Sequence, residues 1–207
     1  MSDPRDLTVH DWIMTASGRP FWTLDPRVED VHIEDIAQAL AAIPRFHGHT
    51  RPRPYSVAQH SVLVSDYAEQ SQVIPCGARR RIAFAALLHD ASEAYLGDVP
   101  RPLKRQPTFA AYRDAEARLQ RVIDEAFGVM LTDDEKRVIA AIDRRMLRTE
   151  QRDLMPPAIP GEGRDDVEPY PFIVAPWPFT LARRRFLMRV RVLSSTNATG
   201  YATTSAH

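Results

Sequence analysis

Apolar residues recur at intervals of three and four along most of this chain, and this spacing is the strongest constraint on its fold. Such a spacing places the apolar side chains on one face of an α-helix. It predicts helices at about residues 33–43, 57–67, 78–89, 109–127, 132–146 and 179–190. Ser56 is expected to cap the second helix, and Thr132 with Glu135 to open the fifth with a capping box. Because the sequence contains no convincing strand pattern beyond a short hairpin or extended arm at 20–24, we predict an all-α fold.

Length and composition predict one compact domain. The chain has 207 residues, of which 44% are hydrophobic, and this is enough for a single core. We expect that domain over residues 1–193. Residues 194–207 are expected to form a flexible tail, because they contain too few apolar side chains to pack.

The charge balance and the cysteine count exclude several classes of protein. The 27 Lys and Arg residues balance the 27 Asp and Glu residues, so no net field attracts a nucleic-acid polymer or an anionic membrane. Cys76 is the only cysteine, which excludes an intrachain disulfide and a zinc site of several thiolates. The sequence shows neither an apolar leader nor a run of about 18 apolar residues. We therefore expect a cytoplasmic protein that does not bind membranes.

Polar residues interrupt the apolar stripes at a few positions. His89, Asp90, Glu93 and Asp98 fall within LLHDASEAYLGDVPRPLK at 87–104, and His60 and Asp143 lie on two other stripes. An unpaired carboxylate in an apolar environment costs several kcal/mol, and a bound cation would remove that cost. The alternatives are that His60 is a satisfied core histidine and that Asp143 pairs with a neighbouring arginine.

Two imidazoles and two carboxylates suit one divalent transition metal, namely Mn²⁺, Co²⁺, Fe²⁺, Ni²⁺ or Zn²⁺. Four protein ligands leave room for a water and a substrate oxygen on a five- or six-coordinate ion, an arrangement typical of hydrolysis. Glu93, four residues after His89, would accept the proton of the water if the helix continued that far.

The order His60, His89-Asp90, Asp143 resembles the H…HD…D signature of HD-domain metal-dependent phosphohydrolases. Three segments resemble sequences of the branch that contains bacterial 5′-deoxynucleotidases and phage deoxynucleoside triphosphohydrolases. They are RFHGHT at 45–50, YSVAQHSVLVS at 55–65 and HDASEAYLGDVPRPLK at 89–104. The resemblance extends from about Trp12 to Asp153. It implies a helical bundle with the metal site between core helices, and a homo-oligomer.

The resemblance also implies a role for individual residues. The metal ligands would be His60, His89, Asp90 and Asp143, and the acid/base residue Glu93. Arg45 would hold the phosphate, for which a guanidinium fork is suited. Asp98 would line the nucleotide site near the sugar or the water, Phe46 would stack on a base or sugar, and Gly48 would line the same pocket. Lys104 either contacts a polyphosphate or is solvated.

We therefore expect an enzyme that cleaves phosphate from a 2′-deoxynucleotide, either a monophosphate or a triphosphate. The sequence does not decide between these substrates, nor the preferred base or the native metal. One alternative is an HD hydrolase of another phosphorylated metabolite or signalling nucleotide. The other is a non-catalytic nucleotide-sensing domain that retains the metal.

Overall fold

The computed structural model describes residues 11–157, 159 and 167–194. Within them it contains eight α-helices and one two-stranded sheet, which confirms the all-α prediction. The helices are α1 (Ile33–Ala42), α2 (Val57–Gln70), α3 (Cys76–Leu87), α4 (Glu93–Leu96), α5 (Arg101–Lys104), α6 (Ala110–Ala126), α7 (Asp133–Leu154) and α8 (Phe179–Ser194). Three short 3-10 segments are η2 (Val28–Asp30), η3 (Arg45–Gly48) and η4 (Pro107–Phe109).

The antiparallel sheet lies near the N-terminal end. Strands β1 (Ile13–Met14) and β2 (Pro20–Phe21) pair Ile13 with Phe21 and Met14 with Pro20. The sequence predicts a short hairpin or an extended arm at 20–24. The structure has a hairpin, but it extends from Ile13 to Phe21. Phe21 is fully buried and stacks on Tyr95 of α4, so the hairpin is attached to the helical core.

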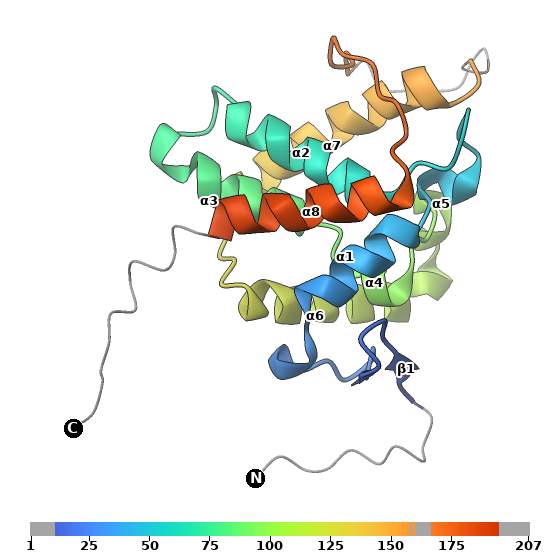
Figure 1. Ribbon diagram of the computed structural model, residues 1–207, viewed down its shortest axis with the longest axis vertical. Coiled ribbons are helices and arrows are strands. Elements are labelled where there is room, and N and C mark those ends of the chain that lie inside the picture. Colours follow the sequence, from blue (N-terminus) through green and yellow to red (C-terminus); the bar gives the residue numbers. More distant parts are fainter. Residues whose placement is uncertain (1–10, 158, 160–166, 195–207) are drawn as a thin grey trace.

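The core lies where α2 packs against its neighbours. Helix α2 contacts α1, α3, α7 and α8, and its buried residues include Val57, His60 and Val64. Figure 1 shows α8 in front of α2 and α3, with α1 next to α8 and α7 behind α2. A polar side chain on the buried face of α2 is therefore held within the centre of the bundle.

Several predicted helix ends are confirmed. The Ser56 hydroxyl accepts a hydrogen bond from the amide of Gln59 at the start of α2. Thr132 and Glu135 form the predicted capping box of α7. Gly128 follows α6 with φ of 64°, a left-handed conformation that glycine adopts at little cost.

The third helix is shorter than predicted. Helix α3 ends at Leu87, so His89 and Asp90 lie in the turn before α4 and not on a helix face. The condition that this helix continues to Glu93 is not met, because Glu93 is the first residue of α4. The Nδ1–H of His89 donates to the carbonyl of Ala86 at 2.8 Å, which satisfies one of the carbonyls that α3 leaves open where it ends.

Helix α8 ends at Ser194, one residue beyond the expected end of the domain at 193. Residues 195–207 of the expected tail lie outside the described residues. None of the described helices combines the length and the apolar character needed to cross a membrane.

Candidate metal centre

Two imidazoles, the buried His60 and the partly exposed His89, point their Nε2 atoms at the same place. His60 projects from the buried side of α2, and its Nδ1–H donates to Glu150 Oε1 at 2.6 Å. His89 donates from Nδ1 to the carbonyl of Ala86. These bonds engage Nδ1 of each ring, and among the described residues neither buried Nε2 has a hydrogen-bond partner of normal geometry. A metal ligand needs an imidazole nitrogen that is left without a protein partner in this way.

Two carboxylates converge on these imidazoles. Asp90 Oδ2 lies 3.5 Å from His60 Nε2 and 3.3 Å from His89 Nε2. Asp143 Oδ1, from α7, lies 3.2 Å and 3.9 Å from the same two atoms. One ligand atom each of His60, His89 and Asp90 lies within 4.8 Å of the others, a spacing that suits a single cation. The structure thus brings together the four residues expected to bind metal.

The charges of this cluster also favour a cation. Burial opposes ionisation of Asp143, but the imidazoles of His60 and His89 and the guanidinium of Arg45 hold its pKa below the usual range. Burial and Arg45 likewise oppose protonation of His60, yet Glu150 and Asp143 raise its pKa to about 10. This point therefore stabilises positive charge beside ionised carboxylates. A divalent ion bound by mixed nitrogen and oxygen ligands fits that requirement.

Arg45 lies beside the carboxylates at a distorted turn. Its Nη1 is 3.5 Å from Asp90 Oδ2, and its backbone amide donates to the carbonyl of Tyr55 at 2.8 Å. The next residues, Phe46 and His47, have φ of 52° and 51°, left-handed values that cost about 1–2 kcal/mol for a residue other than glycine. Such strain is typical of functional loops. The Arg45 side chain itself is held by Glu150 and Asp90.

Glu93 lies in the same cluster as a buried carboxylate. Burial and the charges of Asp90 and Asp98 raise its pKa to about 9, although Arg45 and Lys104 oppose this shift. Its Oε1 is 3.8 Å from Lys104 Nζ, and its Oε2 has no hydrogen-bond partner among the described residues. Lys104 also pairs with Glu116 of α6, and it lines the cavity described next.

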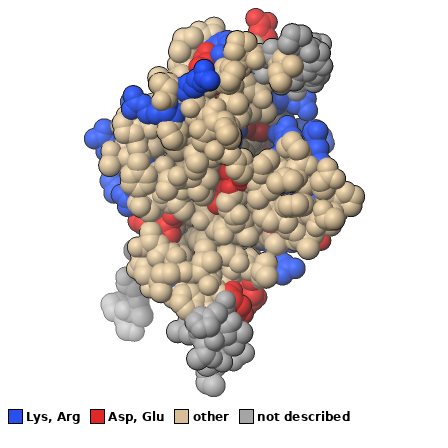
Figure 2. Space-filling model, turned by 90° about the vertical axis from the view of Figure 1, so that its right-hand side faces the viewer, with Lys and Arg blue, Asp and Glu red and all other residues tan. Residues whose placement is uncertain are grey.

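These groups line a cavity of about 690 Å³, large enough for a nucleotide. Asp98 and Phe46 line it as expected, and His47 lines it too, whereas Gly48 does not. Gly48 instead continues the left-handed turn with φ of 78°. The face that carries α5 is hollowed, and basic and acidic side chains gather around the hollow (Figure 2).

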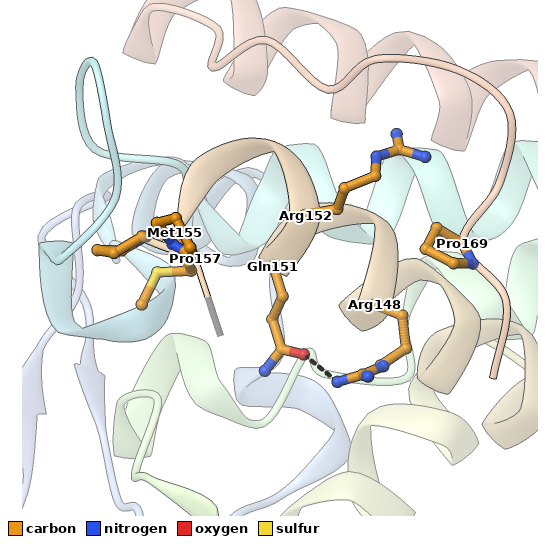
Figure 3. A pocket seen from close by; sticks show the side chains of 7 residues that line it. Arg148, Gln151, Arg152, Met155, Pro157 and Pro169 are labelled. Carbon is orange, nitrogen blue, oxygen red and sulfur yellow. Dashed lines mark hydrogen bonds between the residues drawn. The ribbon is translucent and has the colours of Figure 1, made fainter. Parts of the chain in front are cut away.

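A second cavity of about 410 Å³ adjoins the C-terminal end of α7. Figure 3 shows Arg148 and Gln151 joined by a hydrogen bond of 2.8 Å, and both residues also line the larger cavity. The other lining residues are Arg152, Met155, Pro156, Pro157 and Pro169. Because this cavity lacks the histidines and carboxylates described above, it offers no comparable ligand set.

Glu150 also belongs to the site, although the sequence did not predict it. This residue is fully buried on α7, seven positions after Asp143, and its carboxylate contacts His60, Arg45 and Tyr55. The only available signal was that two helical turns separate it from Asp143, which puts both residues on similar sides of α7.

Comparison with known proteins agrees with this geometry. A protein family described as 5′-deoxynucleotidase YfbR-like matches residues 33–155, more than half of the chain. The chain belongs to this family. YfdR of Escherichia coli strain K12, an uncharacterised protein, is 41% identical over 146 residues, covering 69% of this chain and 72% of YfdR. An uncharacterised protein of Rhodobacter capsulatus is 38% identical over 142 residues, covering 67% and 70% respectively.

Membership in the family places the chain among the HD-domain phosphohydrolases, which use divalent metals. The chain is accordingly a hydrolase with a nucleotide substrate.

Proposed function

We propose that this protein is a metal-dependent phosphohydrolase that removes phosphate from 2′-deoxynucleotides, either monophosphates or triphosphates. The observation that carries the proposal is the convergence of two unpartnered Nε2 atoms, of His60 and His89, with Asp90 and Asp143 beside Arg45. The family supports a 5′-deoxynucleotidase type of reaction. His60, His89, Asp90 and Asp143 are the proposed ligands of one divalent transition metal.

Each remaining residue has a defined task in this proposal. A divalent cation, when bound, would polarise a phosphoryl oxygen and lower the pKa of a water. Arg45 presents its guanidinium to the phosphate, which it binds through two parallel N–H donors. Glu93, with an unpartnered oxygen near the ligand cluster, would accept the proton of the attacking water once a bound cation offsets the charge of Asp90 and lowers the pKa of Glu93. Burial in the cavity wall keeps both groups oriented before the substrate arrives.

The outer part of the cavity selects the substrate. Asp98 is proposed to contact the sugar or the water, and Phe46 to pack on the base or sugar, since both line the cavity. Arg101, Arg105 and Arg148 also line it and supply positive charge beyond Arg45. This charge would accommodate a triphosphate, whereas a monophosphate needs only Arg45.

Phosphate release from a panel of dNMPs, dNTPs and the matching ribonucleotides tests the proposal. The panel is assayed with Mn²⁺, Co²⁺ or a chelator. We expect turnover of deoxynucleotides that depends on the added metal. Turnover confined to other phosphorylated metabolites would contradict the assignment, and metal and nucleotide binding without any turnover would favour a sensing domain.

Two variants separate the proposed ligands from the proposed base. Glu93→Gln should reduce kcat about 10²- to 10⁴-fold because the proton acceptor is lost, while the metal content stays that of the unmodified protein. His89→Ala should lose the ion, as measured by elemental analysis after gel filtration. Glu125→Gln and His49→Ala, changes at exposed residues that do not line the cavity, are the matched controls. Normal metal content in His89→Ala would refute the ligand assignment.

A further inference from the structure

Glu150 is a charged side chain with no exposed surface in the middle of the bundle. It lies on α7, and the groups that contact it come from two other parts of the chain. Arg45 belongs to η3, Tyr55 precedes α2, and His60 lies within α2. Arg45 and His60 are the two residues to which the proposed function gives phosphate-binding and metal-binding roles, and Glu150 contacts both.

The carboxylate of Glu150 accepts three hydrogen bonds. Oε1 accepts from His60 Nδ1 at 2.6 Å and from the Tyr55 hydroxyl at 2.7 Å. Oε2 accepts from Arg45 Nε at 3.2 Å. Oε1 therefore orients the imidazole of His60, and Oε2 orients the guanidinium of Arg45.

Glu150 binds His60 and Arg45 at the atoms that are turned away from the proposed cation and phosphate, namely Nδ1 and Nε. An imidazole that donates from Nδ1 turns its Nε2 toward Asp90 and Asp143, where that nitrogen can bind a cation in place of a proton. A guanidinium held at Nε keeps its outer nitrogens available, and Nη1 of Arg45 is directed toward Asp90. One buried carboxylate thus fixes both an electron-pair donor for a cation and a hydrogen-bond donor for an anion.

Stability alone does not account for such a group. A buried ion pair is often no more stabilising than an apolar side chain of similar volume, because both charges are removed from water. Elsewhere the ionic contacts of α7 are mostly exposed, as in Lys136–Asp133 and Arg137–Asp134. Among the described residues of α7, Glu150 is the only fully buried carboxylate, and it contacts both Arg45 and His60.

We propose that Glu150 is a positioning residue that couples the metal-binding imidazole of His60 to the phosphate-binding guanidinium of Arg45. This inference rests on the proposed function for the roles of these two partners. Beside the two ligand carboxylates, Asp90 and Asp143, it gives Glu150 a role in binding both the cation and the phosphate. Glu150 acts through His60 and Arg45 and is not proposed to contact either ligand.

Glu150→Gln tests the coupling. The amide has one accepting oxygen and one donating nitrogen, so it satisfies His60 or Arg45 but not both. Two constants are measured: the Kd of Mn²⁺ in substrate-free protein by calorimetry, and the Kd of inorganic phosphate with Mn²⁺ present. At least one of them should weaken about 10- to 100-fold, the usual effect of losing the partner of a metal-binding histidine. Values within twofold of the unmodified protein for both would overturn the inference.

A second arm distinguishes positioning from a general loss of structure. In an Arg45→Ala background the amide of Glu150→Gln is free to turn its oxygen to His60, so the double variant should bind Mn²⁺ as tightly as Arg45→Ala alone. Independent, additive losses in the double variant would contradict the coupling. Glu150→Asp, which keeps the charge, should recover part of the affinity lost in Glu150→Gln.

Asp153→Asn is the matched control. Asp153 is another little-exposed carboxylate of α7, but it accepts from the amide of Val174 at 2.7 Å and does not contact His60 or Arg45. This variant should lower the melting temperature and leave both constants unchanged. Both dissociation constants are measured without turnover, so they test the role of Glu150 even if no nucleotide is hydrolysed. The absence of hydrolysis in the nucleotide panel would contradict the proposed function and leave this test unaffected.

Discussion

At the scale of single residues, the charge of Glu93 depends on its neighbours. Burial together with Asp90 and Asp98 favours the protonated carboxyl, and Arg45 and Lys104 favour the carboxylate. Lys104 is the neighbour whose effect is simplest to isolate. It lies 3.8 Å from Glu93 Oε1 and outside the proposed ligand cluster, and Glu116 holds it in place.

Lys104→Gln should move the acidic limb of the kcat/KM profile to higher pH by about 1 unit, a usual effect of one nearby charge. Removing the ammonium takes away a cation that lowers the pKa of Glu93, so the base stays protonated to a higher pH. The measurement is a pH-rate profile at saturating metal, because the acidic limb of kcat/KM reports the base in the free enzyme. Lys136→Gln, an exposed change on α7, should leave the limb in place. A limb that moved to lower pH would contradict this role of Lys104.

The sequence identified some site residues and missed others for a physical reason. His60 and Asp143 interrupt apolar stripes, so their polar side chains are conspicuous in the sequence. Glu150 stands in the run RTEQRD, where a buried carboxylate and an exposed one look the same. What distinguishes Glu150 is its contact with Arg45 and His60, and both come from distant parts of the chain.

At the scale of elements, α7 brings two acidic residues to the site. Asp143 and Glu150 both belong to this helix, and the capping box at Thr132 determines where it begins. The Thr132 hydroxyl accepts from the amide of Glu135, while Glu135 Oε2 accepts from the amide of Thr132 at 2.8 Å. This reciprocal pair satisfies two amides that the start of a helix would otherwise leave open.

Thr132→Ala should lower the free energy of unfolding by about 1 kcal/mol, the usual cost of losing an N-cap hydroxyl. Urea denaturation followed by circular dichroism gives this value. Thr108→Ala, an exposed threonine of η4 that is not at such a cap, should change the midpoint much less. Equal midpoints for the two variants would show that the capping box does not contribute.

Helix boundaries were predictable where a local signal marks them and not elsewhere. Ser56, Thr132 and Gly128 carry the chemistry of a cap in their own side chain or backbone. The end of α3 at Leu87 has no such signal, because neither glycine nor proline occurs between Leu87 and Leu96. There the apolar stripe continues past the point at which the helix ends, and contacts of the folded chain, such as His89 with Ala86, accompany the break.

At the scale of the whole molecule, the proposed ligands come from three parts of the bundle. His60 belongs to α2, His89 and Asp90 to the turn between α3 and α4, and Asp143 to α7. A cation bound by all four would connect elements that otherwise meet through apolar packing. Without a cation, Asp90 and Asp143 have only the side chains of Arg45, His60 and His89 to balance their charge.

Metal binding should therefore stabilise the fold and not only activate the enzyme. A ligand that binds only the folded state at 100 times its Kd adds about 2.7 kcal/mol. For a chain of this length that corresponds to a rise in melting temperature of about 5 to 10 °C. Thermal unfolding of chelator-treated protein with and without Mn²⁺ or Co²⁺ measures the rise, and His49→Ala should show it in full. His89→Ala should abolish it because the remaining ligands no longer bind the ion. The same melting temperature with and without metal in the unmodified protein would mean that these elements are not joined by a cation.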